Sequence, residues 1–339
     1  MKRDLGTSDD RAFALAHEGS ILLDRYAEEH DVGLLRQAET HLRAAAERDP
    51  SFAFALFTHG AALESLGDVQ AAIDRFDHLR NRFPDYNPDL VTYNLATAHL
   101  CLYRSSAYDQ AEPLFIELTQ ESTRQDVRML AFAGLATVYA LRMVKIAGRP
   151  DREADIRSFQ AKIEDYADRA GRIVQERPQR DWYADEAQWQ IHNARGIKHM
   201  YLALHDFKCD RPRIASETQF DLAQREFESS LRVSPRNLDA LSNLGTLHLF
   251  RWKVAPADRD DLLEESRKMW LIVVRARPEM SFGHFRLGQV ERRRGDFVTA
   301  RDALNRSLSV FQEVEEAEVR KELALAEASD SSDSDRRAG

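Results

Sequence analysis

Apolar and small residues recur along the chain in a two-part helical pattern. In the clearest copy, residues 53–85, Gly60 lies in one helical stretch, and Ala72 and the bulky Phe76 follow in the next. Side chains three or four positions apart share one face of a helix, so this spacing predicts two helices packed through that face. Runs of alternating β-branched residues typical of strands are nearly absent. The pattern therefore predicts an all-α protein.

The same offsets return more than two hundred residues later. In the last copy Gly288 is followed by the turn Gly295-Asp296, by Ala300 and by Leu304, as Gly60 is followed by Gly67-Asp68 and then Ala72 and Phe76. About seven copies, including these two, can be aligned along the chain. Self-similarity at a fixed period is the signature of a repeat array, in which each helix pair packs on its neighbours.

The pattern resembles the tetratricopeptide repeat, a helix-turn-helix unit of 34 residues. Pro50 and Pro84 close two successive copies at that period, and the glycine, alanine and bulky positions follow the family's order. The resemblance covers almost the whole chain. It implies an α-solenoid of antiparallel helix pairs that forms a right-handed superhelix with a concave groove.

Copies four to six depart from the family's length. In the fourth, the first helix continues to a break at Gly148-Arg149-Pro150, and a second long helix is expected over 151–177. The fifth copy carries about fifteen additional residues, including 206–214, between its two helical stretches. The sixth has a smaller insertion around 254–258. We expect these insertions to distinguish this chain from a regular array.

The domain organisation follows from these patterns. We expect a flexible N-terminus over 1–9, a repeat solenoid over 10–312, and a capping helix over 313–328 that covers the apolar edge of the last repeat. The last segment, 329–339, is rich in serine and aspartate and has no large apolar residue to bury, so it is predicted to be disordered.

Composition narrows the class of function. The net charge of −9 gives no sequence-wide basic field for a nucleic-acid backbone. The two cysteines have no metal-binding spacing. We expect no membrane span, which needs roughly 18–20 consecutive apolar residues. The N-terminus lacks the apolar core of a signal peptide. We therefore expect a cytoplasmic protein that has no membrane partner and does not generally bind nucleic acid.

Catalytic signatures are not found in the sequence. It contains no phosphate-binding glycine loop, no nucleophile elbow and no HExxH, so we expect a non-enzyme without cofactor or metal. The densest histidine cluster is His192, His199 and His205. His192 and His199 lie two turns apart, farther than the i, i+4 spacing of a shared metal, so these rings are interpreted as helix packing.

The resemblance also implies where a partner binds. In the family the first helices line the groove, and the residue before the leucine-glycine pair projects into it. Asn94 and Asn243 hold that position here, and an amide can both donate to and accept from an extended peptide. The candidate face is aromatic toward the N-terminus and basic toward the C-terminus, which suits a segment with acidic residues. The candidate partner-binding residues are Phe57, Tyr93, Asn94, Asn243, Phe285, Arg286, Gln289, Arg292 and Arg293.

The sequence thus favours a non-enzymatic interaction scaffold or adaptor that binds a peptide or helical segment of another protein. Two alternatives remain open. One is a regulatory receptor whose ligand-dependent solenoid conformation controls a separate effector. The other is an RNA-binding repeat protein that uses the arginine-rich end, which the net negative charge opposes. The extended helices of repeat four are also a candidate homodimer contact.

Overall fold

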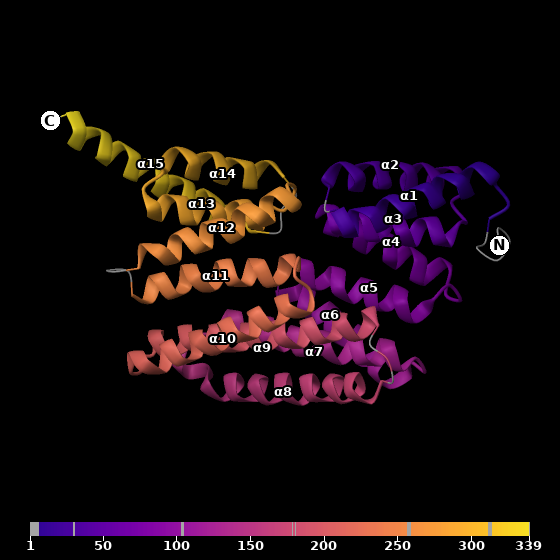
Figure 1. Ribbon diagram of the computed structural model, residues 1–339, viewed down its shortest axis with the longest axis horizontal. Coiled ribbons are helices and arrows are strands. Elements are labelled where there is room, and N and C mark those ends of the chain that lie inside the picture. The colour runs from indigo at the N-terminus through magenta and orange to yellow at the C-terminus, as the bar shows by residue number, and fades with distance from the viewer. Residues whose placement is uncertain are drawn as a thin grey trace. The chain divides into compact units, whose positions relative to one another are not determined.

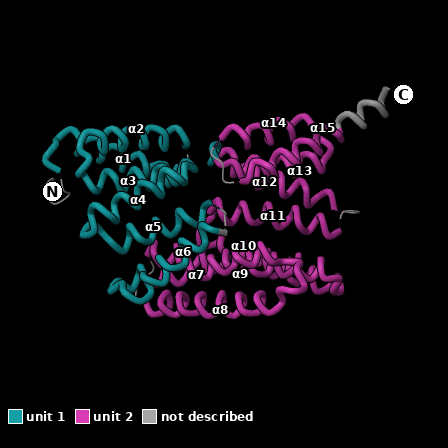
Figure 2. Tube along the Cα trace, turned by 180° about the vertical axis from the view of Figure 1, so that it is seen from behind, with its two compact units in different colours: residues 1–127, 276–279 teal, residues 128–275, 280–339 magenta. Residues whose placement is uncertain are grey.

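The computed structural model describes residues 7–29, 31–102, 105–177, 179, 181–255, 259–310 and 314–338; for 105 and 330–338 only the backbone is described. Throughout these residues the secondary structure is helical, without a β-strand (Figure 1). The chain divides into two compact units. Unit 1 comprises residues 1–127 and 276–279, and unit 2 comprises 128–275 and 280–339 (Figure 2). The all-α prediction is confirmed.

Unit 1 is built of three helix pairs. Consecutive helices pack against each other along this part of the chain. Their bounds are α1 Asp10–Glu29, α2 Val32–Arg48, α3 Ala53–Leu66, α4 Val69–Arg82, α5 Pro88–Cys101 and α6 Ser105–Glu121. The next helix, α7 (Gln125–Ile146), begins in unit 1 and continues into unit 2, so the boundary between the units falls inside a helix.

Unit 2 continues the helix pairs with longer members. The bounds of its elements are η2 Pro150–Arg152, α8 Glu153–Glu176, α9 Trp182–Lys208, α10 Arg213–Val233, α11 Leu238–Val254, α12 Asp260–Ala276, α13 Ser281–Arg294, α14 Phe297–Ser309 and α15 Glu316–Ala338. Paired helices such as α9 and α10, or α13 and α14, pack closely along their lengths.

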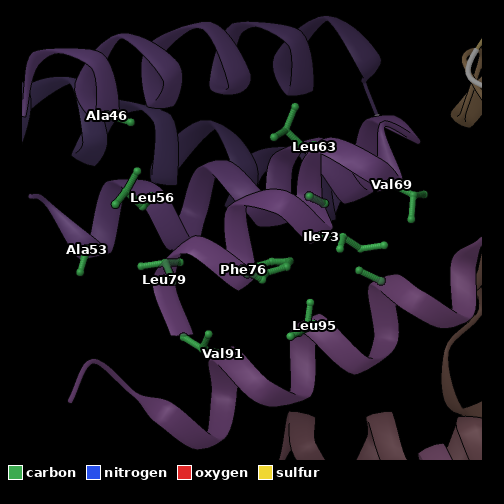
Figure 3. Close-up of a cluster of buried hydrophobic side chains, with 12 residues drawn as sticks. Ala46, Ala53, Leu56, Leu63, Val69, Ile73, Phe76, Leu79, Val91 and Leu95 are labelled. Carbon is green, nitrogen blue, oxygen red and sulfur yellow. The ribbon is translucent and has the colours of Figure 1, made fainter. Parts of the chain in front are cut away.

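The core of unit 1 shows why the pattern specifies helix pairs. Leu56 and Leu63 of α3, Ile73 and Phe76 of α4, and Leu95 of α5 are buried in one cluster (Figure 3). Each helix contributes apolar residues at three- or four-residue spacing to the same cluster. Burial of apolar side chains of this size stabilises the folded state by about 1.5–3 kcal/mol each.

Glycine sets the closest approach within a pair. A Cβ on Gly60 would lie 2.7 Å from Cε1 of Phe76, so only glycine admits that ring at this distance. The same relation joins Gly196 to Phe227, Gly245 to Trp270 and Gly288 to Leu304. In the first copy Gly19 meets Leu42, a contact that the sequence analysis missed.

Buried serines add a matching hydrogen bond in two copies. Ser230 Oγ donates to the carbonyl of Trp189 at 3.2 Å, and Ser307 Oγ donates to the carbonyl of Ser281 at 2.9 Å. Each serine lies three residues after the bulky residue that fills the glycine site, so the two bonds are equivalent. They fix the register of the second helix against the first.

The insertion of the fifth copy is helical. The extra residues lengthen α9 and α10 and leave only the turn 209–212 between them, where the sequence suggested a long connection. His205 near the end of α9 accepts a hydrogen bond from the backbone N–H of Gly148 (3.0 Å) and contacts Glu153 (2.7 Å). The overlong helices α7 and α8 are thus held by the lengthened α9.

Helix α8 buries its predicted apolar stripe within unit 2. Ile156, Ile163 and Ala170 are buried, and Tyr166 stacks on Tyr139 of α7 with 5.9 Å between ring centres. The break at Gly148-Arg149-Pro150 lies where predicted, with Gly148 at φ +83°. Because these residues are buried within unit 2, they do not form an exposed apolar surface for the predicted homodimer contact. That contact stays a prediction.

Helix α7 differs from expectation in its hydropathy. Among the described residues it is the one helix long and apolar enough to cross a membrane. Of its apolar window, 67% is buried inside the protein. Buried core helices and membrane spans share this composition, so length and hydropathy by themselves do not separate them.

Both ends of the chain have local structure where they are described. Thr7 is buried and its hydroxyl donates to Asp49 at 2.5 Å, while Asp9 accepts from the backbone of Ala12 and so caps α1. Residues 1–6 lie outside the described part. At the other end α15 runs to Ala338, through the tail predicted to be disordered. A lack of apolar residues argues against burial but does not prevent a local helix.

Candidate functional site

The first helices of the pairs in unit 2 form a continuous row. Helix α11 contacts α9 on one side and α13 on the other. Asn243 of α11, at the position predicted to project from the row, donates from Nδ2 to Oδ1 of Asn193 on α9 at 3.0 Å. Its own Oδ1 has no hydrogen-bond partner among the described residues. We call α9, α11 and α13 the first-helix row.

One end of this row carries four cations, Lys253 of α11 and Arg286, Arg292 and Arg293 of α13, which we call the basic cluster. Arg286 of this cluster is bordered by aromatic rings. Its guanidinium carbon lies 4.9 Å from the ring centre of Phe282 and 5.5 Å from that of Phe250. Burial lowers the pKa of Arg286 from its ordinary value, and its Nε has no hydrogen-bond partner.

A carboxylate from α15 neutralises part of the basic cluster. Glu322 accepts from Nε of Arg292 at 2.9 Å and from Nε2 of Gln289 at 3.0 Å, and it lies 3.7 Å from Nη2 of Arg293. Gln289 also accepts from Arg286 at 2.9 Å. A hydrogen-bonded chain therefore runs from Arg286 through Gln289 to the C-terminal helix.

Lys253 is the exposed member of the basic cluster. Its ammonium lies 5.2 Å from the ring centre of Phe250, the ring that Arg286 also borders. The protein packed around this ammonium, together with the charges of Arg293 and Arg286, lowers the pKa of Lys253 to about 8. The described residues offer Lys253 neither a hydrogen bond nor an ion pair.

The candidate residues of unit 1 face inward. Tyr93 is buried and packs edge-on to Phe115, with 6.1 Å between ring centres. Phe57 packs on Phe76 at 5.9 Å as part of the hydrophobic core. Asn94 donates from Nδ2 to the carbonyl of Leu90 in its own helix at 2.8 Å. Tyr93 is thus part of the core, whereas Phe57 is half-buried at the edge of the core, and the predicted contacts of these residues with a partner stay predictions.

Two candidates of unit 2 are also buried. Phe285 packs in the core between α13, α14 and α15, and Gln289 is held between Arg286 and Glu322. Of the predicted groove residues of α13, Phe285 is in the core, Gln289 bridges Arg286 and Glu322, and the arginines carry the charge. Of the nine candidates, Asn243, Arg286, Arg292 and Arg293 keep polar or charged groups near the surface of the first-helix row.

Comparison with known proteins places the repeats in a family. Residues 31–87, which include the Gly60–Phe76 pair, match the model of the tetratricopeptide repeat. Residues 31–87 are thus tetratricopeptide repeat sequence, and the all-α helix pairs of the described chain agree with this assignment. No curated protein sequence matches it.

Solved structures that are similar to this chain include tetratricopeptide repeat proteins. One is from Parabacteroides merdae, with 13% identity over 94% of this chain and 99% of the other, and a TM-score of 0.43. The tetratricopeptide domain of P58(IPK) has 12% identity over 95% and 99%, with a TM-score of 0.33. Yeast Tom70 has 13% identity over 96% and 97%, with a TM-score of 0.28. At these TM-scores no property of those proteins transfers to this chain.

The site includes two charged residues, Lys253 and Glu322, that the sequence analysis did not predict. Lys253 lies ten residues after Asn243 and three after Phe250 on one face of α11, so helical spacing could have predicted it. Glu322 had no such signal, because nothing local indicates which residue of a capping helix meets α13. Neither Lys253 nor Glu322 occupies a groove position of the family, so the resemblance did not indicate them.

The repeat histidines lie among packed side chains. Burial lowers the pKa values of His99, His199 and His248, which occupy equivalent places in three copies. His199 also contacts Oε1 of Gln219 on the paired helix at 2.7 Å. These observations agree with their interpretation as packing residues.

The end of α9 brings a thiol and an imidazole together without forming a nucleophile-base pair. Cys209 Sγ lies 3.7 Å from both ring nitrogens of His205, so it lies over the face of the ring and not along a lone pair. The Nδ1 of His205 is already occupied by the N–H of Gly148. Among the described residues, no group of three or more histidine, cysteine, aspartate or glutamate side chains has a metal-binding arrangement.

Proposed function

We propose that the chain is a non-enzymatic protein-interaction scaffold or adaptor, and that the first-helix row of unit 2 binds a peptide or helical segment of another protein. Tetratricopeptide repeats typically serve protein interaction, and residues 31–87 match their model. The observation that supports the location most directly is the basic cluster. It retains cationic groups without partners at one end of the row.

Polar groups on the row suit the backbone of an extended or helical segment. The free Oδ1 of Asn243 is an acceptor for a peptide N–H, and its pairing with Asn193 holds it in place. A fixed acceptor loses little rotamer freedom when a partner binds, which favours affinity.

Charge gives the segment an orientation. The free cations of the basic cluster attract an acidic portion of the partner to the end of the row formed by α11 and α13. Electrostatic attraction of this kind chiefly raises the association rate and decreases with added salt. The partner is therefore expected to carry its acidic residues toward one end of the bound segment.

Selection from a random library of displayed peptides tests the proposal. The intact protein is expected to enrich peptides with an acidic end, and their affinity should fall at least tenfold in Asn243→Ala and in Lys253→Glu. Lys268→Glu is the matched control, because Lys268 is an exposed lysine on the second helix α12 that pairs with Glu265.

Two results would contradict the proposal. If no peptide is enriched over a bare-surface selection, peptide binding by this chain is not supported. If the selected peptides bind Lys253→Glu and Lys268→Glu equally well, the first-helix row near Lys253 is not the binding surface.

A further inference from the structure

We infer that the basic cluster binds a phosphoryl group, a doubly charged anion, beside Lys253 of α11 and Arg286 of α13. Phosphate binding here would be a property of unit 2 itself and does not require the peptide interaction proposed above. The phosphoryl group could belong to a free small molecule or to a phosphorylated side chain, and both share the chemistry that the cluster recognises.

The first argument is the balance of charge. The four cations of the cluster are Lys253, Arg286, Arg292 and Arg293. Among the described residues, the carboxylates that act on Arg286 are Glu322, which is nearly enclosed, and Glu318, which is exposed on α15; Glu322 also acts on Lys253. Tyr201 of α9 is also within reach, and burial raises its pKa, so it stays neutral. Two positive charges remain unbalanced.

The second argument is that the unbalanced charge is localised. Arg292 donates to Glu322, and Arg293 lies beside the same carboxylate and donates to the carbonyl of Gln289 at 2.7 Å. Arg286 donates only through Nη1, to Gln289, and Lys253 has no hydrogen bond within the described chain. The charges without an anionic partner are therefore those of Lys253 and Arg286.

The third argument is the surroundings of these two cations. Both border the ring of Phe250, and Phe282 and Phe285 lie around the guanidinium of Arg286. Apolar rings exclude water and lower the local dielectric constant, which strengthens the attraction of an anion. An unpaired charge is costly where it is enclosed, as at Arg286 with its buried and unsatisfied Nε, so a bound anion would relieve that cost.

A phosphoryl group fits this excess better than a carboxylate. A phosphate monoester carries about −1.5 to −2 at pH 7, whereas a carboxylate carries −1 and would leave one cation unbalanced. Its oxygens also accept hydrogen bonds in several directions, which suits one planar guanidinium and one flexible ammonium.

Nuclear magnetic resonance titration of the intact, isotope-labelled protein tests the assignment. The probes are inorganic phosphate and a blocked five-residue alanine peptide with phosphoserine, glutamate or serine at its centre. Amide shifts near Lys253 and Arg286 are expected with both phosphate probes at constant ionic strength. Equal affinities of the two would indicate a free phosphate ligand, and tighter binding of the phosphopeptide would indicate a phosphorylated protein segment.

Variants localise the effect. Lys253→Gln is expected to weaken phosphate binding at least tenfold, whereas Lys268→Gln should not change it; both lysines are exposed, so neither change should unfold the protein. In the unmodified protein the affinity should decrease between pH 7 and pH 9, because Lys253 loses its proton with a pKa of about 8. The pH dependence should be absent in Lys253→Gln.

The assignment is overturned if the glutamate peptide binds as tightly as the phosphoserine peptide, or if Lys253→Gln and Lys268→Gln behave alike. Failure here would leave the peptide selection described above untouched, since that experiment uses unphosphorylated peptides. Success here with no peptide enriched there would mean that the basic cluster binds phosphoryl groups while the proposed binding of unmodified peptides is wrong.

Discussion

Glu322 of α15 accepts a hydrogen bond from the side-chain amide of Gln289 on α13 at 3.0 Å. The same carboxylate accepts from Arg292, and Gln289 in turn accepts from Arg286. The C-terminal helix therefore has two roles in unit 2. Its apolar residues, such as Val319 and Ala326, cover the core of the last helix pair, and its glutamate determines which cations of the basic cluster remain unpaired.

Removing the charge of Glu322 should destabilise unit 2. In Glu322→Gln the nearly enclosed Arg292 and Arg293 lose their carboxylate, and leaving such groups unsatisfied costs about 1–3 kcal/mol. Urea unfolding followed by circular dichroism measures the change. Glu316→Gln is the control on the same helix, because Glu316 pairs with Arg320 at an exposed position and should change stability by less than about 0.5 kcal/mol. Equal effects of the two variants would argue against the assigned role of Glu322.

Two glycines of neighbouring helices should respond in opposite directions to the same substitution. In Gly196→Ala the new Cβ would lie 2.4 Å from Cε1 of Phe227, so overpacking is expected to cost about 1–3 kcal/mol. In Gly171→Ala, on α8, nothing lies within 4 Å of the new Cβ, and the better helix propensity should stabilise by about 0.5–1 kcal/mol. Thermal unfolding of both variants provides the measurement. A neutral Gly196→Ala would mean that the helices do not meet at this glycine.

The contribution of one buried hydroxyl group, that of Ser307 in α14, to stability can be measured by substitution. Ser307→Ala removes the bond to the carbonyl of Ser281 and should lower the free energy of unfolding by about 1 kcal/mol. Ser309→Ala, two residues later, removes an exposed bond to the carbonyl of Arg306 and should have little effect. The midpoints of urea unfolding distinguish the two variants, provided that the denaturant dependence of the unfolding free energy is the same in both. The prediction fails if Ser309→Ala is the more damaging change.

The packed histidines should make stability depend on pH. Burial lowers the folded-state pKa values of His199 and His248 below the unfolded value of about 6.5, so the unfolded chain binds protons more readily. The free energy of unfolding should therefore fall as the pH drops below about 6.5, and the contribution of both rings is fully present above it. Unfolding curves from pH 8 to pH 5 test this. His248→Gln should have a smaller slope, and an unchanged slope would exclude His248 as a contributor.

The sequence predicted the parts of the fold that local patterns encode. The glycine and bulky positions of the second and seventh copies, exemplified by Gly60 and Phe76, identified the helix pairs, and Gly148-Arg149-Pro150 identified the end of α7. Gly19 was not predicted, because the turn of the first copy is longer than the family's and the copy was assigned from its leucine and alanine positions. Local spacing shows which residues share a helix face, but a repeat array has several buried faces in succession.

The candidate site was harder to predict for the same physical reason. On a first helix the core face and the partner-facing face adjoin, and a rotation of one residue separates the buried Phe285 from the charged Arg286. The sequence analysis placed Tyr93 and Gln289 on the same face as the family's groove position, whereas both are buried. Glu322 reaches α13 across a tertiary contact between helices far apart in sequence, and no periodicity predicts such a pairing.

The glycine contacts described above also show where the chain tolerates change. Gly60 and Phe76 are joined by a short turn, whereas Gly196 and Phe227 are separated by two lengthened helices, and yet both pairs meet in the same way. The two helices can therefore extend beyond their glycine contact and still keep their register at that contact. The exposed turn between α9 and α10 is thus a natural insertion point, where a reporter domain could be grafted at a distance along the chain from the basic cluster.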